Sequence, residues 1–194
     1  MPGALFAGAS AGAAFALPLN NAADSFKLAL CKRLYALLMV GSLTAQMIVV
    51  LVSTVAISSL ATRFEEERSL GDFLRRYYYL EYVTTRWNFL SGVVAFVAGV
   101  GVRAWISIDC PVIARGALAI CGSGSLLALA FVEENSHRTG EASVAALPLV
   151  YARLLARRAA ESRVFAAAAA ASLLTAVYVA WAIPHVVAYG LAAL

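Results

Sequence analysis

Four long stretches of this sequence contain almost no charged residues, and they limit the fold more than any other feature. A helix that crosses about 30 Å of hydrocarbon needs roughly 20 apolar residues, and each stretch is long enough. The predicted spans are residues 34–62, 87–108, 110–132 and 164–183. Inside a membrane, helices satisfy all their backbone polar groups within one segment. The sequence therefore predicts an all-α polytopic integral membrane protein with four transmembrane helices and short interfacial helices.

The composition excludes several other classes of protein. Hydrophobic residues make up 62% of the 194 residues and charged residues only 13%, whereas soluble domains are roughly 45–50% apolar. Disorder requires low hydrophobicity and high net charge. Three cysteines are too few, and odd in number, for a disulfide scaffold. Cys31 and Cys110 are expected on the same side of the membrane, so they form a disulfide only if that side is oxidising. Free thiols are the favoured interpretation.

The connections between the spans carry most of the charge. Residues 63–86 form a charged loop rich in aromatic side chains, and residues 133–163 begin with a polar turn. In the rest of that second connection Arg153, Arg157 and Glu161 recur every four residues opposite an apolar side. This pattern predicts an amphipathic helix that lies in the membrane interface.

Both ends of the chain are apolar, but neither adds a fifth span. Residues 1–33 form an N-terminal extension that is short in apolar length and lacks the basic region of a secretory signal. It is predicted to pack on a neighbour or lie on the membrane; a targeting remnant in residues 1–24 is the alternative. Pro184 has no backbone donor and disfavours helix before it. Residues 184–194 are therefore predicted to be an interfacial tail.

The basic residues are distributed unevenly about the spans. Four spans put both termini on one side and both charged loops on the other. The loop side holds ten Lys and Arg and the terminal side five, so the positive-inside tendency places the loops in the matrix, stroma or cytoplasm. Because the bases flank apolar runs and form no single basic face, membrane lipid is an expected partner and nucleic acid is not.

Arginines within the spans are candidate functional residues, because charge inside a membrane is costly. Arg103 and Arg115 both lie near the terminal-side interface, where a guanidinium can extend along the helix to reach water. The sharper interpretation is that they form, with Asp109 between them, an electropositive pocket for a lipid head group or an anionic cofactor. Bound lipid is therefore expected.

Small and aromatic residues mark the predicted contacts with other helices and partners. Small side chains let helices approach closely, which predicts packing at Gly41, Ala45, Ala95 and Gly99. The aromatic loop is the candidate contact with a neighbouring subunit. Its candidate residues are Arg75, Arg76, Tyr77, Tyr78, Tyr79 and Tyr82.

Polar residues in the first two spans allow two interpretations, a pore lining or hydrogen bonds between helices, of which the second is more common. They are Ser42, Thr44, Gln46, Ser53, Thr54, Asn88 and Ser91. No acidic residue is predicted near the middle of any span, which removes the usual proton relay or cation site of a pump.

The residues suited to catalysis are few. The two histidines, His137 and His185, are predicted on opposite sides of the membrane, and a metal site needs convergent ligands. The sequence has no HExxH, P-loop or GxGxxG motif. We therefore predict no enzyme activity, no metal and no cofactor other than lipid.

One short segment resembles a motif of light-harvesting chlorophyll proteins. Glu81 and Arg86 have the spacing of the Glu and Arg that supply pigment ligation and an interhelix ion pair in that family. Thr84 stands where the motif has Asn or His, and the match covers six residues of 194. The chain is not assigned to the family, and bound pigment stays open.

Together these observations favour a non-catalytic accessory subunit of a large energy-transducing membrane complex, either respiratory, ATP-synthesising or photosynthetic. Such a subunit packs against core subunits and lipid. One alternative is a small oligomeric channel or carrier with Gln46, Thr44 and Asn88 facing a pore. Another is a four-span membrane scaffold. The expected location is an organelle, with the mitochondrial inner membrane first and the thylakoid second.

Overall fold

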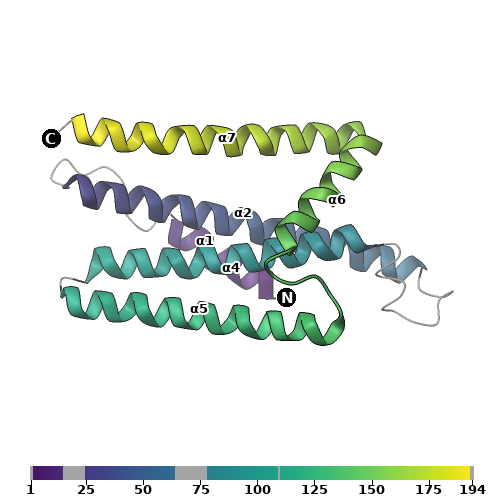
Figure 1. Ribbon diagram of the computed structural model, residues 1–194, viewed down its shortest axis with the longest axis horizontal. Helices are drawn as coiled ribbons and strands as arrows, with labels where there is room; N and C mark the ends of the chain where they lie inside the picture. The colour runs from purple at the N-terminus through teal and green to yellow at the C-terminus, as the bar shows by residue number, and fades with distance from the viewer. Residues whose placement is uncertain (1, 15–24, 64–77, 109, 193–194) are drawn as a thin grey trace.

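The computed structural model is helical throughout the residues that it describes, which are 2–14, 25–63, 78–108 and 110–192 (Figure 1). The helices are α1 (Pro2–Ala14), α2 (Phe26–Arg63), α4 (Tyr79–Ser107), α5 (Pro111–Thr139), α6 (Leu147–Glu161) and α7 (Arg163–Ala192). Within these ranges there is no strand.

Four of these helices are long and apolar enough to cross a membrane. The spanning stretches are Phe26–Ser58, Tyr79–Ser107, Pro111–Arg138 and Arg163–Ala182. Each overlaps one of the predicted spans, and successive spans run in opposite directions (Figure 1). The chain is therefore an all-α polytopic membrane protein.

Two segments predicted as loop are helical in the structure. Residues 79–86 form the start of α4, and residues 133–139 form the end of α5. The apolar runs mark only the part of a helix that contacts hydrocarbon, and the helix continues where its side chains become polar. α5 ends at Gly140, which has the left-handed φ of 66° and caps the helix as glycine commonly does.

The prediction that Pro184 ends the last helix was wrong, because α7 continues to Ala192. A proline removes one backbone N–H and so leaves a single carbonyl, one turn earlier, without its donor. Membrane helices tolerate this loss, and proline is more frequent in them than in soluble helices. The predicted span nevertheless agrees with the stretch Arg163–Ala182.

The central contact of the fold joins α2 and α4. Tyr35 and Met39 of α2 are completely buried, and Phe96 and Val102 of α4 pack against them. A side chain at Gly99 would collide with Met39, and a Cβ at Gly92 would lie 2.5 Å from Nε2 of Gln46. The absence of side chains at these positions of α4 leaves room for the ends of Met39 and Gln46, and at Gly92 it also brings the Ala45 Cβ within 3.1 Å of the Cβ position.

The N-terminal helix α1 packs against α2 and also contacts α4. The Tyr35 hydroxyl donates a hydrogen bond to the carbonyl of Ala13 at 2.6 Å, and Ala13 packs on the buried Tyr35–Met39 pair. The described part of this apolar segment thus packs on neighbouring helices, and a targeting remnant in residues 1–24 stays an alternative.

The remaining helices extend from the α2–α4 pair in two directions. α5 packs against α4 on the side away from α2, while α7 lies beyond α2 at the opposite edge of the molecule (Figure 1). The predicted amphipathic helix is α6, which contacts α4 and connects to α7. Its first residue, Leu147, is 1% exposed, whereas Arg153 and Arg157 are exposed.

We expect Gly92→Leu to destabilise the chain by about 1–3 kcal/mol, the usual cost of overpacking a well-packed contact. The new side chain would displace Gln46 and separate α2 from α4. The measurement is the free energy of unfolding of the purified chain in mixed micelles of increasing SDS fraction.

Gly41→Leu is the matched control, because nothing lies within 4 Å of a Cβ at Gly41. Both substitutions gain the same helix propensity, so the difference between them reports the packing at Gly92. Equal unfolding curves for the two variants would contradict the close α2–α4 contact.

Candidate functional site

Two polar side chains of α2 are buried against α4. Ser42 Oγ donates a hydrogen bond to the carbonyl of Gly92 at 2.8 Å, and Gln46 Nε2 donates to the carbonyl of Phe89 at 3.3 Å. Both side chains are 0% exposed. The interpretation of Ser42 and Gln46 as bonds between helices is therefore confirmed, and in a single chain neither lines a pore.

The other polar residues of these two spans bond within their own helix. Thr44, Ser53 and Thr54 each donate to the carbonyl four residues earlier, as does the Asn88 amide, and Ser91 donates to the carbonyl of Asn88. Such bonds shield a polar side chain in an apolar environment without a partner helix.

Arg103 is directed into the contact between α2 and α4. Its Nη1 donates to the Tyr35 hydroxyl at 3.2 Å, and its guanidinium carbon lies 5.9 Å from the centre of the Tyr35 ring, within range of a cation–π interaction. Arg115 is exposed on α5. The contacts of the described residues therefore do not bring the two arginines into one pocket, and Asp109 lies outside the described residues. Lipid head group binding stays a prediction for both.

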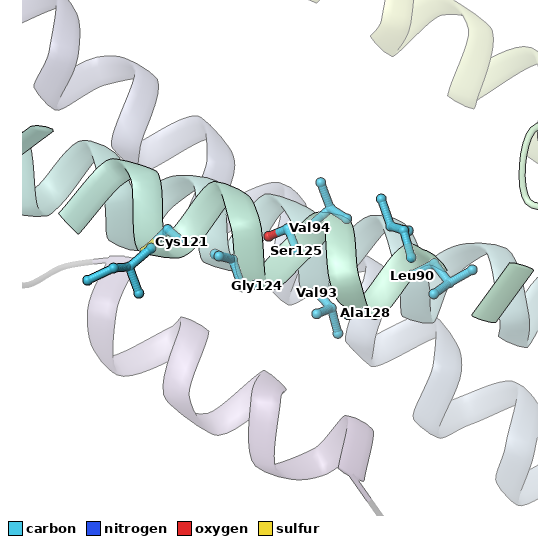
Figure 2. A pocket seen from close by; sticks show the side chains of 10 residues that line it. Leu90, Val93, Val94, Cys121, Gly124, Ser125 and Ala128 are labelled. Carbon is cyan, nitrogen blue, oxygen red and sulfur yellow. The ribbon is translucent and has the colours of Figure 1, made fainter. Parts of the chain in front are cut away.

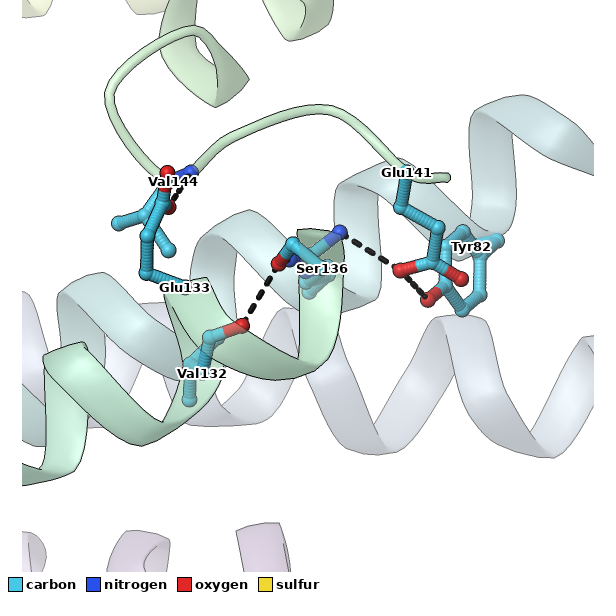
Figure 3. A network of polar contacts seen from close by, with 7 residues as sticks. Tyr82, Val132, Glu133, Ser136, Glu141 and Val144 are labelled. Carbon is cyan, nitrogen blue, oxygen red and sulfur yellow. Dashed lines mark hydrogen bonds and ion pairs between the residues drawn. The ribbon is translucent and has the colours of Figure 1, made fainter. Parts of the chain in front are cut away.

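The densest polar cluster lies where the loop after α5 meets α4. We call Tyr82, Arg86, Ser136 and Glu141 the loop clasp (Figure 3). Oε2 of Glu141 accepts hydrogen bonds from the Tyr82 hydroxyl at 2.7 Å and from Arg86 Nη1 at 2.8 Å. Arg86 Nη2 also donates to the Ser136 hydroxyl, which donates in turn to the carbonyl of Val132.

The Arg86–Glu141 ion pair is largely withdrawn from solvent, with side chains 12% and 22% exposed. Charge-assisted hydrogen bonds of this kind are about twice as strong as neutral ones. Arg86 belongs to the segment that resembles the chlorophyll-protein motif, and it uses two of its nitrogens in the loop clasp. Its ion-pair partner is Glu141, which lies outside that segment.

A second anchor holds the same loop to α5. Oε2 of Glu133 accepts the backbone N–H of Val144 at 2.6 Å (Figure 3), and its Oε1 lies 3.3 Å from Nε2 of His137. The backbone N–H of Leu147 then donates to the carbonyl of Ser143 at 3.0 Å, which begins α6. The loop clasp and Glu133 thus fix where α6 starts, and through α6 they fix α7.

The chemistry of this cluster is that of an anchor. Ser136 donates its hydroxyl proton to the carbonyl of its own helix, which is not the arrangement of an activated nucleophile. Among the residues that the structure describes, no group of three or more His, Cys, Asp or Glu is arranged to hold a metal ion. Cys31, Cys110 and Cys121 are free thiols, so the structure does not contain the Cys31–Cys110 disulfide.

The predicted packing residues are only partly in the α2–α4 contact. Ala45 lies 3.1 Å from a Cβ built at Gly92, and Gly99 is buried against Met39. Ala95 is partly buried, and Gly41 faces open space. The sequence analysis missed Gly92, although its spacing of seven residues from Gly99 puts both on one helix face.

The aromatic partner surface is described only in part. Tyr79 and Tyr82 are 39% and 40% exposed, and the Tyr82 hydroxyl is already bonded to Glu141. Tyr78 is partly buried. Arg75, Arg76 and Tyr77 lie outside the described residues, so the partner contact stays a prediction.

An apolar groove separates the middles of α4 and α5 (Figure 2). It has a volume of about 290 Å³. Leu90, Val94 and Val97 line it from α4, and Gly124, Ser125 and Ala128 line it from α5. Cys121, Gly124 and Ser125 of the small-residue stretch 121–125 lie in its lining.

Comparison with known proteins adds no family to these observations. No family model, curated protein or solved structure matches the chain. Any functional assignment therefore rests on the residues and the geometry of the chain itself.

We expect Glu141→Ala to lower the free energy of unfolding by about 1.5–3 kcal/mol, the usual range for hydrogen bonds to charged groups. It would leave the Arg86 guanidinium without its carboxylate in a largely buried position. Hydrogen exchange followed by mass spectrometry would show faster exchange in residues 140–150, because the loop is released from α4.

Glu134→Ala is the control, because Glu134 pairs with Arg138 on the exposed surface of α5, with side chains 61% and 75% exposed. An exposed pair of this kind contributes about 1 kcal/mol or less. If Glu134→Ala destabilised the chain as much as Glu141→Ala, the loop clasp would not be the anchor of this loop.

Proposed function

We propose that the chain is a non-catalytic subunit of a larger membrane assembly, and that it works by packing against neighbouring subunits and lipid. The observation that carries this proposal is the exposure of α7. None of the residues of its spanning stretch, Arg163–Ala182, whose burial the structure describes is buried within the chain. Leu173 and Leu174 are 67% and 70% exposed. A span with so little packing of its own is suited to contacts outside the chain.

The composition of α7 supports protein contacts in addition to lipid. Helices associate in membranes through close packing of small residues, and α7 contains the six-alanine run Ala166–Ala171. All but one of these alanines are exposed. Large apolar side chains follow the run, among them Tyr178 and Trp181, which are 65% and 59% exposed. α7 thus offers a neighbour a segment of small side chains followed by a segment of bulky ones.

The polar clusters support a structural role. The loop clasp uses its donors and acceptors to hold a loop, and Ser42 and Gln46 use theirs to hold α2 against α4. An energy-transducing complex of an organelle is the assembly that we propose, with the charged loops on the matrix, stroma or cytoplasmic side. Bound lipid belongs to the same proposal.

The channel alternative has little support, because two of the residues suggested for its pore lie in or beside the α2–α4 contact. Gln46 and Asn88, two of the three residues suggested for a pore, are 0% and 8% exposed and bond to backbone carbonyls. A pore formed by several copies would need other residues in its lining. The scaffold alternative differs from a subunit mainly in stoichiometry.

We expect Ala170→Phe to reduce the fraction of the chain that migrates with partner subunits in a native gel after extraction in mild detergent. The new ring would prevent close approach to α7 without disturbing the chain itself, because Ala170 is exposed. The unfolding transition of the isolated variant should stay unchanged.

Ala98→Phe provides the control, since Ala98 is an exposed residue of α4 and receives the same ring. Migration of the unaltered chain alone, with no change in complex assembly on its deletion, would contradict the proposal. A band containing only copies of this chain would favour the oligomeric channel, and a variable excess over its partners would favour the scaffold.

A further inference from the structure

The groove between α4 and α5 is lined by large apolar side chains of both helices and by small residues of α5. Leu90 and Val94 line it from α4, and Gly124 and Ala128 line it from α5 (Figure 2). The larger residues of α5 in the lining are Ile120 and Leu129. Small residues normally allow membrane helices to touch. Here they do not, since nothing lies within 4 Å of a Cβ built at Gly124.

The two helices are in contact on either side of the groove. At one end α4 touches α5 closely, because a Cβ at Gly101 would lie 2.9 Å from Cδ2 of Leu118. Toward the other end, Arg86 of α4 donates a hydrogen bond to Ser136 of α5. The groove is therefore limited in length to the stretch between these two contacts.

The groove lies at the depth of the hydrocarbon. Its residues fall in the middle of the spanning stretches Tyr79–Ser107 and Pro111–Arg138. Its lining is apolar except for the Ser125 hydroxyl and the Cys121 thiol. A bound water needs two to four polar partners, so this lining does not hold a row of water molecules.

The groove is narrow. Leu90 and Val97 are about 10 Å apart along α4, so a volume of about 290 Å³ corresponds to a mean cross-section of roughly 28 Å². A single extended hydrocarbon chain is slender enough to enter.

We infer that the groove between α4 and α5 binds one acyl chain of a membrane phospholipid. The chain enters from the surrounding bilayer at the depth where the groove opens, and its methylene groups contact Val94 on one side and Gly124 and Ala128 on the other. The site rests on the lipid contact in the proposed function, but it needs no protein partner, so its failure is distinguishable from a failure of the proposed assembly.

The test is photolabelling of the full chain in phosphatidylcholine vesicles that contain a small fraction of phosphatidylcholine with a diazirine in the middle of one acyl chain. Mass spectrometry locates the adducts. We expect the residues of the groove to be labelled several-fold more than Leu173 and Leu174, which lie in the middle of α7 and are exposed. Equal labelling of both places would overturn the inference without any variant.

Gly124→Leu fills the groove and should reduce the labelling of α4 and α5 several-fold. Gly122→Leu is the matched control, because Gly122 lies on the same helix, is exposed, has open space around it and does not line the groove. Ala128→Leu repeats the test at a second position. Retained labelling in well-folded Gly124→Leu and Ala128→Leu variants would also overturn the inference.

A second copy of the chain is the competing occupant, because one of its side chains would fill the groove in place of a lipid. Cys121 lines the groove, so a variant with Cys31→Ser and Cys110→Ser carries its only thiol there. Efficient oxidation of this variant to a disulfide-linked dimer in the vesicles would assign the groove to a second copy and reject the lipid. We expect it to remain monomeric under oxidation.

Discussion

Two helices in a membrane gain little by hiding apolar surface from each other, since lipid is as apolar as leucine. The pair α2 and α4 is therefore held by close packing at Gly92 and Gly99 and by the buried hydrogen bonds of Ser42 and Gln46. Of the other described helices, α1 packs on α2, α5 packs on α4, and α6 also contacts α4. The glycines and the polar side chains act together, because the hydrogen bonds form only when the backbones are close.

A second, more local constraint sets the shape of the chain. The loop clasp and Glu133 fix residues 140–146 against α4 and α5, and so decide the direction in which α6 leaves. α7 has few contacts beyond α6, so its place in the molecule depends on polar bonds at one end of the bundle. This arrangement separates an anchored part, made of α1, α2, α4 and α5, from a span that is open to neighbours.

Some residues of the candidate sites could be predicted from the sequence, and others could not. Ser42 and Gln46 could be proposed as interhelical donors because a polar side chain in a span has few other partners. Gly92 could have been found from its heptad spacing to Gly99, whereas the sequence does not show which side of α2 carries Gly41, since that depends on the rotation of the helix. The pairing of Arg86 with Glu141 joins residues 55 positions apart, and nothing in a single sequence sets such a pair.

Hydropathy alone determined that this chain has four membrane spans and an amphipathic helix, because the cost of placing charge or unpaired backbone in hydrocarbon applies to each segment separately. The direction of Arg103 toward Tyr35 was decided by tertiary structure. So was the groove between α4 and α5, whose lining comes from residues of both helices. These features arise from distances between helices, and such distances are a property of the assembled bundle.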